Sequence, residues 1–210
     1  MLQMINFIIV IMIPDIQIEL RRFVSPNVVS KLSKFYNEKE SLLNKAIDAS
    51  VATILIGTCS KLGQLQLYED MMLRIENSEF YKEIDFDSIE LRSVEDCYSE
   101  EGDDLLSLIF DHKKERITEM VSNETGIKSD TAREVLNFSA LLVLSYFKNK
   151  KQLVDSFHFL LEEQKRGILN TIPYGIKMIL GFPNHDAVEE KIEAISSYSF
   201  FNFFSSQVSS

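Results

Sequence analysis

The sequence predicts an all-α protein in which two divergent copies of one helical unit pack into a helical bundle. Each copy consists of a short helix, a break in the left-handed αL conformation and a long buried helix. Only seven glycines and four prolines occur among 210 residues, so turns are few and elements are long. Apolar residues recur at helical spacing, and the pattern of the first half returns in the second half at an offset of 89 residues.

An apolar N-terminal segment, residues 1–24, opens the chain. Its first thirteen residues are rich in Ile, Met and Phe, and Pro14 follows them. That run is too short to span a bilayer, and it lacks the basic region and the small-residue cleavage site of a signal peptide. We therefore expect a segment that packs on the rest of the protein.

The first helical unit is expected at residues 25–75. Ser25 and Pro26 read as an N-cap followed by Pro in the first helical turn, so a short helix should span 27–36. Val28, Val29, Leu32 and Phe35 should form its buried side. Asn37 tolerates the αL conformation and should end the helix. A long helix over 40–62 follows, apolar or small nearly all round between Ala49 and Cys59, and a third helix is expected over 65–75.

An acidic linker is expected at residues 76–104. It holds twelve acidic and two basic side chains, so it carries the whole net charge of −10. Within it, Ile84, Phe86, Ile89 and Leu91 give a short apolar alternation. Residues 97–104 read as an exposed acidic loop, with Asp103 or Asp104 capping the helix that follows.

The second helical unit is expected at residues 105–184. At the offset of 89, Ile117 and Val121 take the places of Val28 and Leu32, Gly126 takes that of Asn37, and Ser139 takes that of Ser50. Helices are predicted over 105–109, 113–123, 130–149 and 151–167, with a short turn of helix around 176–180. Small residues in the two long helices (Ala49, Ser50, Ala52, Ser139 and Ala140) should let these helices approach closely.

A C-terminal helix and an aromatic tail are expected at residues 185–210, with the helix over 186–196. The tail places Phe200, Phe201, Phe203 and Phe204 within five residues. These rings either dock on the chain's own core or contact a partner or a second copy, because exposed apolar patches mark interaction sites.

The chain resembles the bacterial family called domain of unknown function 937, which includes YidB-like proteins and relatives fused to peptidoglycan-binding OmpA-like domains. The resemblance rests on SPNVVSKLS at 25–33, AIDASVATILIG at 46–57, GDDLLSLIF at 102–110, TGIKS at 125–129 and the stretches 136–147 and 164–181. It covers about residues 25–182. The family's frequent proline in each central helix is absent, since Ala52 and Leu141 stand near those positions. The resemblance implies a helical fold and supplies no activity and no functional residue.

No motif in the sequence points to a catalytic, cofactor or metal site. The glycines form neither GxGxxG nor a P-loop, and no HExxH or GxSxG occurs. Cys59 should pack as a small hydrophobic residue. His158 lies between Phe157 and Phe159 and should be packed as well. The acidic linker should be a solvated or partner-facing surface, with weak cation binding as the alternative.

We expect a non-catalytic helical interaction or structural module with a protein partner or self-association, and no cofactor. An enzyme with an unrecognised site between the two units is the first alternative, and a polar pocket holding His158 or Glu162 would favour it. The acidic charge argues against nucleic-acid binding, and Lys148, Lys150 and Lys151 suit a helix end instead. We expect a cytoplasmic protein without stable membrane insertion, with association with the cell envelope as the second alternative.

Overall fold

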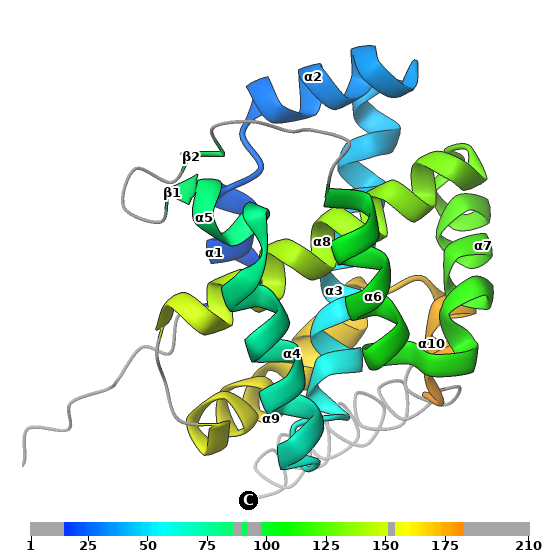
Figure 1. Cartoon of the computed structure of the whole chain (residues 1–210). Helices are drawn as coiled ribbons and strands as arrows, with labels where there is room; N and C mark the ends of the chain where they lie inside the picture. The colour runs from blue at the N-terminus through cyan, green and yellow to red at the C-terminus, as the bar shows by residue number, and fades with distance from the viewer. Residues whose placement is uncertain (1–14, 86–89, 92–97, 151–153, 183–210) are drawn as a thin grey trace, which may run out of the picture.

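Two long helices, α3 (Glu40–Cys59) and α8 (Ser129–Lys150), pack against each other at the centre of the computed structural model (Figure 1). The structure describes residues 15–85, 90–91, 98–150 and 154–182. Around the central pair lie α1 (Ile16–Arg22), α2 (Pro26–Tyr36), α4 (Leu65–Asn77), α5 (Glu79–Glu83), α6 (Tyr98–Phe110), the 3-10 turn Asp111–Lys113, α7 (Lys114–Thr125), α9 (Val154–Thr171) and α10 (Tyr174–Leu180). A two-residue antiparallel ladder pairs β1 (Ile84–Asp85) with β2 (Glu90–Leu91). The predicted all-α helical bundle is confirmed.

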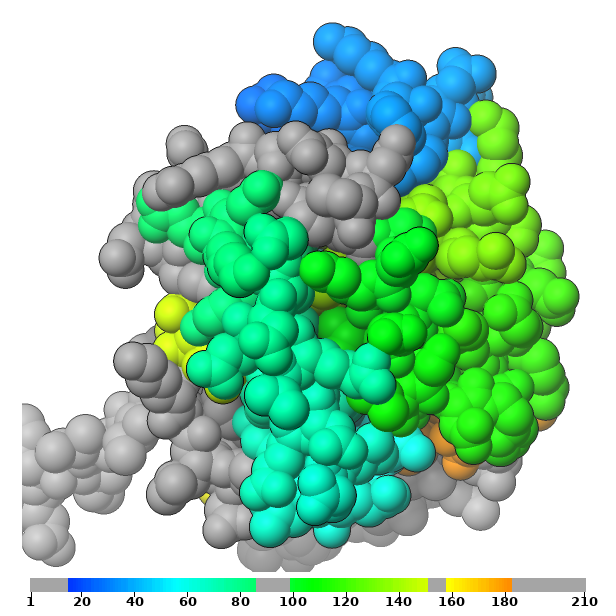
Figure 2. Space-filling view, in the orientation of Figure 1, coloured from blue at the N-terminus to red at the C-terminus, as the bar shows by residue number. Residues whose placement is uncertain are grey.

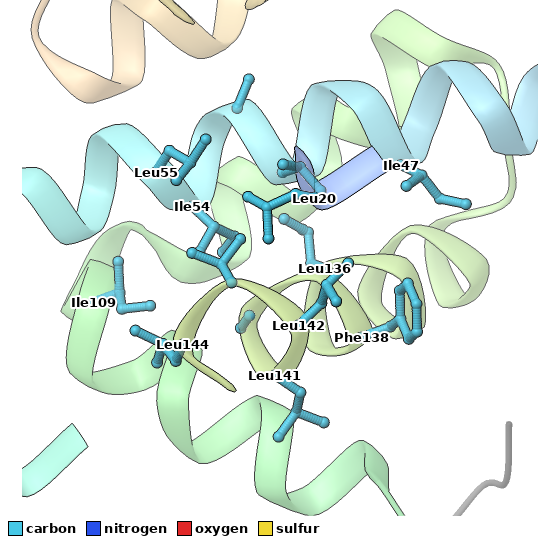
Figure 3. Packing of buried hydrophobic residues seen from close by; sticks show 14 of the residues in the cluster. Leu20, Ile47, Ile54, Leu55, Ile109, Leu136, Phe138, Leu141, Leu142 and Leu144 are labelled. Carbon is cyan, nitrogen blue, oxygen red and sulfur yellow. The ribbon is translucent and has the colours of Figure 1, made fainter. Parts of the chain in front are cut away.

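The core surrounds α3 and α8 because both helices are apolar on nearly every side. Every residue of α3 from Ala49 to Cys59 is buried, and so is every residue of α8 from Val135 to Phe147. Figure 3 shows Ile54 of α3 pointing toward α8, the helix that carries Leu136, Leu142 and Leu144. Among the described residues, α3 is the one helix whose length and composition alone would allow it to cross a membrane. Its burial among other helices accounts for that apolarity.

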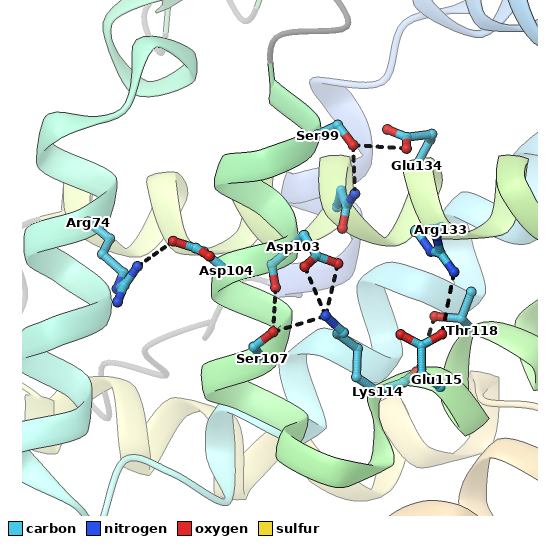
Figure 4. Close-up of polar contacts among 11 residues, drawn as sticks. Arg74, Ser99, Asp103, Asp104, Ser107, Lys114, Glu115, Thr118, Arg133 and Glu134 are labelled. Atoms are coloured by element: carbon cyan, nitrogen blue, oxygen red, sulfur yellow. Dashed lines mark hydrogen bonds and ion pairs between the residues drawn. The ribbon is translucent and has the colours of Figure 1, made fainter.

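The helices α4, α6 and α7 lie side by side over one face of the core (Figure 2). Gly102 permits the close approach of α6 to α8, since a Cβ atom there would lie 2.6 Å from the Cα of Asn137. Polar contacts hold α6 on both sides (Figure 4). Asp104 pairs with Arg74 of α4 at 2.5 Å, and Asp103 pairs with Lys114 of α7 at 2.9 Å.

The caps of α2 agree with the sequence prediction. Ser25 accepts a hydrogen bond from the backbone N–H of Val28, and Pro26 occupies the first turn. Asn37 ends the helix with φ 51°, and Gly126 ends α7 with φ 80°, so both predicted αL residues are confirmed. Each αL loop is closed by a serine hydroxyl that donates to the backbone carbonyl of the residue five positions later, with 2.7 Å between the oxygens in each loop.

The loop after α2 also supports the start of α8. The Glu38 carboxylate accepts a hydrogen bond from the backbone N–H of Lys128 at 2.9 Å and one from the hydroxyl of Thr131 at 3.4 Å. The Lys128 ammonium in turn donates to the carbonyls of Tyr36 and Asn37. The Glu38 side chain is only 8% exposed, so this contact is part of the packed structure.

Several expectations from the sequence were wrong. Residues 98–104, expected to be an exposed loop, form the first half of α6, so Asp103 and Asp104 lie inside a helix and do not cap it. Phe35 is 63% exposed, because the buried face of α2 consists of Val28, Val29 and Leu32. The helix α1 was not predicted.

Several expectations lie outside the described residues: the packing of residues 1–14, Phe86 and Ile89 of the apolar alternation, Lys151, the helix at 186–196, and the aromatic tail with Phe200, Phe201, Phe203 and Phe204. Of the apolar alternation in the acidic stretch, Ile84 lies in β1 and Leu91 pairs with it from β2.

Candidate functional site

An apolar groove with a volume of about 600 Å³ lies between α1 and α3. Val24, Ile47 and Val51 line it and are nearly completely buried. Ile18 also lines the groove and leaves 64% of its surface exposed to solvent. An apolar concavity with a large exposed aliphatic side chain is the usual form of a binding site for an apolar ligand or segment.

Arg21 is the principal polar group of this groove. Its Nε lies 3.3 Å from the carboxylate of Asp48, and its Nη2 donates to the side-chain carbonyl of Asn44. Its Nη1 is buried and has no hydrogen-bond partner. Partial burial raises the pKa of Asp48 against the lowering effect of Arg21, although more than half of the Asp48 side chain stays in water. The groove is therefore lined by a guanidinium that Asp48 and Asn44 hold in place.

Contacts with α8 and α9 hold α1 in place as one wall of the groove. Asp15 caps the helix by accepting hydrogen bonds from the backbone N–H groups of Gln17 and Ile18. The backbone N–H of Ile16 donates to Gln164 of α9, and the Gln17 amide donates to Thr171 at 2.9 Å. A further contact joins α1 to α8, where the Tyr146 hydroxyl donates to the Glu19 carboxylate.

A second groove, of about 590 Å³, lies between α4 and α6 and is more polar. Asp70, Arg74, Glu101 and Asp104 contribute to its lining, and the ion pair between Arg74 and Asp104 runs across it (Figure 4). A ligand there would have to replace that pair, so the groove beside α1 is the better candidate for binding.

Cys59 lies in the last turn of α3 and is 4% exposed, as expected for a small hydrophobic residue. Its thiol nevertheless has a polar partner, because it donates a hydrogen bond to the Glu162 carboxylate of α9 at 3.1 Å. Burial, followed by this contact with Glu162, raises the pKa of Cys59 to about 12. The pKa of Glu162 is lowered by its hydrogen bonds with Lys165 and Cys59. The thiol is therefore protonated at neutral pH and is a poor nucleophile as it stands.

His158 was expected to be packed, and that expectation is wrong. Its side chain is 50% exposed, and the adjacent Phe159 is 61% exposed. This turn of α9 lies at the surface, and the imidazole Nε2 of His158 is 3.8 Å from Glu162 Oε1. His158 and Glu162 thus lie together, at the end of α3 and not between α3 and α8.

The seam between α3 and α8 is lined by apolar and small side chains. Its polar side chains include Ser50, Thr53 and Ser139, which are completely buried. Thr53 and Ser139 donate to carbonyls of their own helices, which removes their need for an outside partner. None of the described buried residues of these two helices carries an Asp, Glu, His, Lys or Arg side chain.

The lysines at the end of α8 contact carboxylates where they are described. Lys148 pairs with Glu76 of α4 at 2.7 Å, and Lys150 lies 3.5 Å from Glu19 of α1. Tyr146 and Phe147 are buried, as their helical phase predicts.

The sequence analysis did not predict α1, and so it did not predict the groove. Two signals pointed to this helix: Asp15, a residue type typical of N-caps, follows Pro14, and the apolar residues Ile16 and Leu20 are four positions apart.

The comparisons with known proteins identify a family and nothing closer. A family model described as a bacterial protein of unknown function (DUF937) matches residues 19–150, which is more than half of the 210 residues. No curated protein and no solved structure matches the chain. The matched range includes Arg21, Asp48 and Cys59, while His158 and Glu162 lie beyond it.

Proposed function

Because the chain belongs to the DUF937 family of bacterial proteins of unknown function, and membership specifies no activity, we propose a function from the geometry. The protein is a non-catalytic helical module that holds an apolar segment of a partner protein in the groove between α1 and α3. The single observation that carries this proposal is the groove itself, in which exposed Ile18 stands beside the buried Val24, Ile47 and Val51.

The polar groups of the groove suit a peptide segment. Asp15, Asp48, Arg21 and Arg22 all line it, so its formal charge is balanced and a charged small molecule gains little from it. Nη1 of Arg21 is buried without a hydrogen-bond partner, and a rotation of the side chain that exposes it would let it donate to a backbone carbonyl or a carboxylate of the segment. A few fixed polar groups around an apolar floor are how binding sites set orientation.

The net charge favours a different protein over a second copy of the chain. Each chain carries a formal charge of −10, so two copies repel each other at long range. A neutral or basic partner meets no such repulsion. The experiment must therefore distinguish binding of a different protein in the groove from self-association of the chain.

We also propose that the two halves of the fold are copies of one helical unit. Ser33 and Ser122 stand 89 positions apart and donate equivalent hydrogen bonds to Glu38 and Ile127, which also stand 89 positions apart. Duplication of one unit explains why both αL loops have the same closing contact.

Site-specific photo-crosslinking in the native host tests the binding proposal. A photo-reactive residue at Ile18 should yield a discrete adduct with another protein, and the same residue at Leu65 should not. Leu65 is the matched control, because it is 59% exposed and begins α4, outside both grooves. The adduct should disappear when Arg21→Ala is added. Equal yields from both positions, or an adduct of twice the chain mass, would contradict binding of a partner in this groove.

The aromatic tail remains a second proposed contact, through Phe200, Phe201, Phe203 and Phe204. A chain ending at Ser197 should keep the Ile18 adduct if the groove acts alone and lose it if the tail contributes. We propose a cytoplasmic protein, and recovery of the chain in the membrane or envelope fraction of the native host would favour the envelope alternative.

A further inference from the structure

Three side chains with different metal-binding atoms meet where the end of α3 contacts α9. The ligand atoms of Cys59, His158 and Glu162 all lie within 4.8 Å of one another. Cys59 Sγ is 3.1 Å from Glu162 Oε1, and His158 Nε2 is 3.8 Å from the same oxygen. From this geometry we propose that the three residues bind a thiophilic divalent cation of the Zn²⁺ type.

The distances suit a tetrahedral ion after small side-chain rotations. Zinc binds thiolate sulfur at about 2.3 Å and imidazole nitrogen or carboxylate oxygen at about 2.0–2.2 Å. Ligand atoms in such a tetrahedron are separated by about 3.3–3.8 Å by simple geometry. The separations of Glu162 Oε1 from Cys59 Sγ and from His158 Nε2 are 3.1 and 3.8 Å, and all three ligand atoms lie within 4.8 Å of one another, so small rotations bring them into this range. His158 and Glu162 are one turn apart on α9, so both side chains leave the helix on the same face.

The donor atoms select the type of cation. Calcium and magnesium prefer sets made wholly of oxygen, and they gain little from a thiol or an imidazole. A set of sulfur, nitrogen and oxygen fits Zn²⁺, and Co²⁺ accepts the same geometry. Three protein ligands leave a fourth position, which solvent can reach because the His158 and Glu162 side chains are 50% and 44% exposed.

Binding would replace one hydrogen bond. In the metal-free protein the thiol proton of Cys59 is directed at Glu162. The cation takes the place of this proton, which is released to solvent, while His158 binds through its neutral ring nitrogen. Lys165 donates to both oxygens of Glu162, at 2.9 and 3.1 Å. It can keep Oε2 while Oε1 binds the metal, and it would then orient the carboxylate.

The bound ion would join parts of the chain that are distant in sequence. Cys59 and Glu162 are 103 residues apart, and they belong to the central helix and to the helix that follows α8. A ligand that binds only the folded state stabilises it. The ion would therefore hold α9 against the end of α3.

Cobalt absorption tests the proposal on the full chain carrying Cys97→Ser, which leaves Cys59 as its single thiol. Titration with Co²⁺ should give a thiolate-to-cobalt charge-transfer band that saturates at one ion per chain, and Zn²⁺ should abolish it. Cys59→Ser should remove the band. His158→Gln and Glu162→Gln should each weaken binding at least about 100-fold, since even residues that only support a ligand contribute about 10- to 100-fold.

His112→Gln is the matched control, because the His112 side chain is 80% exposed and is not one of the three clustered residues. It should leave the band and the affinity unchanged. Since Cys59 is buried, Cys59→Ser can disturb folding, whereas His158 is at the surface and its variant retains the native core. A missing band in the folded Cys97→Ser protein would overturn the proposal. So would binding that His158→Gln and Glu162→Gln leave unchanged.

Discussion

The thiol of Cys59 donates a hydrogen bond to the carboxylate of Glu162, with 3.1 Å between Sγ and Oε1. This contact joins the end of the central helix α3 to α9 and keeps the thiol protonated. The same carboxylate accepts hydrogen bonds from Lys165 and lies 3.8 Å from His158. A thiol, an imidazole and a carboxylate therefore meet at the end of α3, whereas the described buried residues of α3 and α8 carry no Asp, Glu, His, Lys or Arg side chain.

The Cys59 thiol should resist alkylation in the metal-free Cys97→Ser protein. Its pKa is raised from 9.0 to about 12 by burial and then by Glu162, so the thiolate fraction at about pH 9 should be at least about 100-fold below that of the unfolded chain. Iodoacetamide kinetics across alkaline pH measure this. Glu162→Gln should lower the pKa and speed the reaction, while Glu163→Gln should not. Equal rates in the folded and unfolded chains would contradict the expectation.

The same contact predicts how stability depends on pH. The folded pKa of Cys59 is above its unfolded value, so the stabilisation is complete below about pH 9 and is lost as the pH rises toward 12. The pKa of Glu162 is lowered, so its stabilisation is present above the ordinary value of 4.5 and is lost as the pH falls below it. Denaturant unfolding at acidic, neutral and alkaline pH, with Glu162→Gln as comparison, checks both signs.

Gly102→Ala should destabilise the protein by about 1–3 kcal/mol, because the new Cβ would lie 2.5–2.7 Å from three atoms of Asn137 and would push α6 from α8. Gly167→Ala is the matched control. It lies within α9, has nothing within 4 Å of a Cβ, and should stabilise the helix by about 0.5–1 kcal/mol. Urea unfolding measures both changes. Similar effects of the two variants would show that α6 and α8 are not in close contact at Gly102.

Glu38→Ala should cost about 1–2 kcal/mol of unfolding free energy. It would leave the backbone N–H of Lys128 without its acceptor, in a position where the Glu38 side chain is only 8% exposed. Glu115→Ala removes an exposed ion pair with Arg133 and should change stability by less than about 0.5 kcal/mol. Thermal unfolding of the two variants side by side distinguishes the buried contact from the surface pair.

Ser139→Leu and Ala49→Leu should each destabilise the protein by about 1–3 kcal/mol, since both residues are buried in the central helices and the added atoms overpack the core. Ser41→Leu, on the exposed first turn of α3, is the control and should be nearly neutral. Melting temperatures give the comparison. Unchanged melting in both core variants would show that α3 and α8 do not meet at these positions.

The sequence predicted most helices because their signals are local. Ser25 and Asn37 mark the two ends of α2, Gly126 marks the end of α7, and each works through contacts within a few residues. Local sequence signals for a helix were weaker in the acidic stretch, where charged residues outnumber apolar ones. The acidic residues 98–104 read as a loop, yet their neighbours Leu105, Leu106 and Ile109 pack on the core and extend one helix through them.

Side-chain environments were harder to predict than helices. Periodicity says which residues share a face, and the packing of other helices decides whether that face is covered. Phe35 and His158 were assigned to buried faces by their apolar neighbours, and both are exposed, since no described helix covers those turns.

By itself, the sequence determined the all-α class, the two buried central helices and the αL ends of α2 and α7. These follow from hydrophobic spacing and from the conformational preferences of single residues. The tertiary structure alone decided that Glu38 supports α8, that α1 and α3 enclose a groove, and that Cys59 meets His158 and Glu162. The contacts of Glu38 and of Cys59 join residues about a hundred positions apart in the sequence, and the groove exists only because α1 and α3 cross at a particular angle. These features depend on the angles and distances at which the helices pack, and those are set by small residues and side-chain volumes throughout the core.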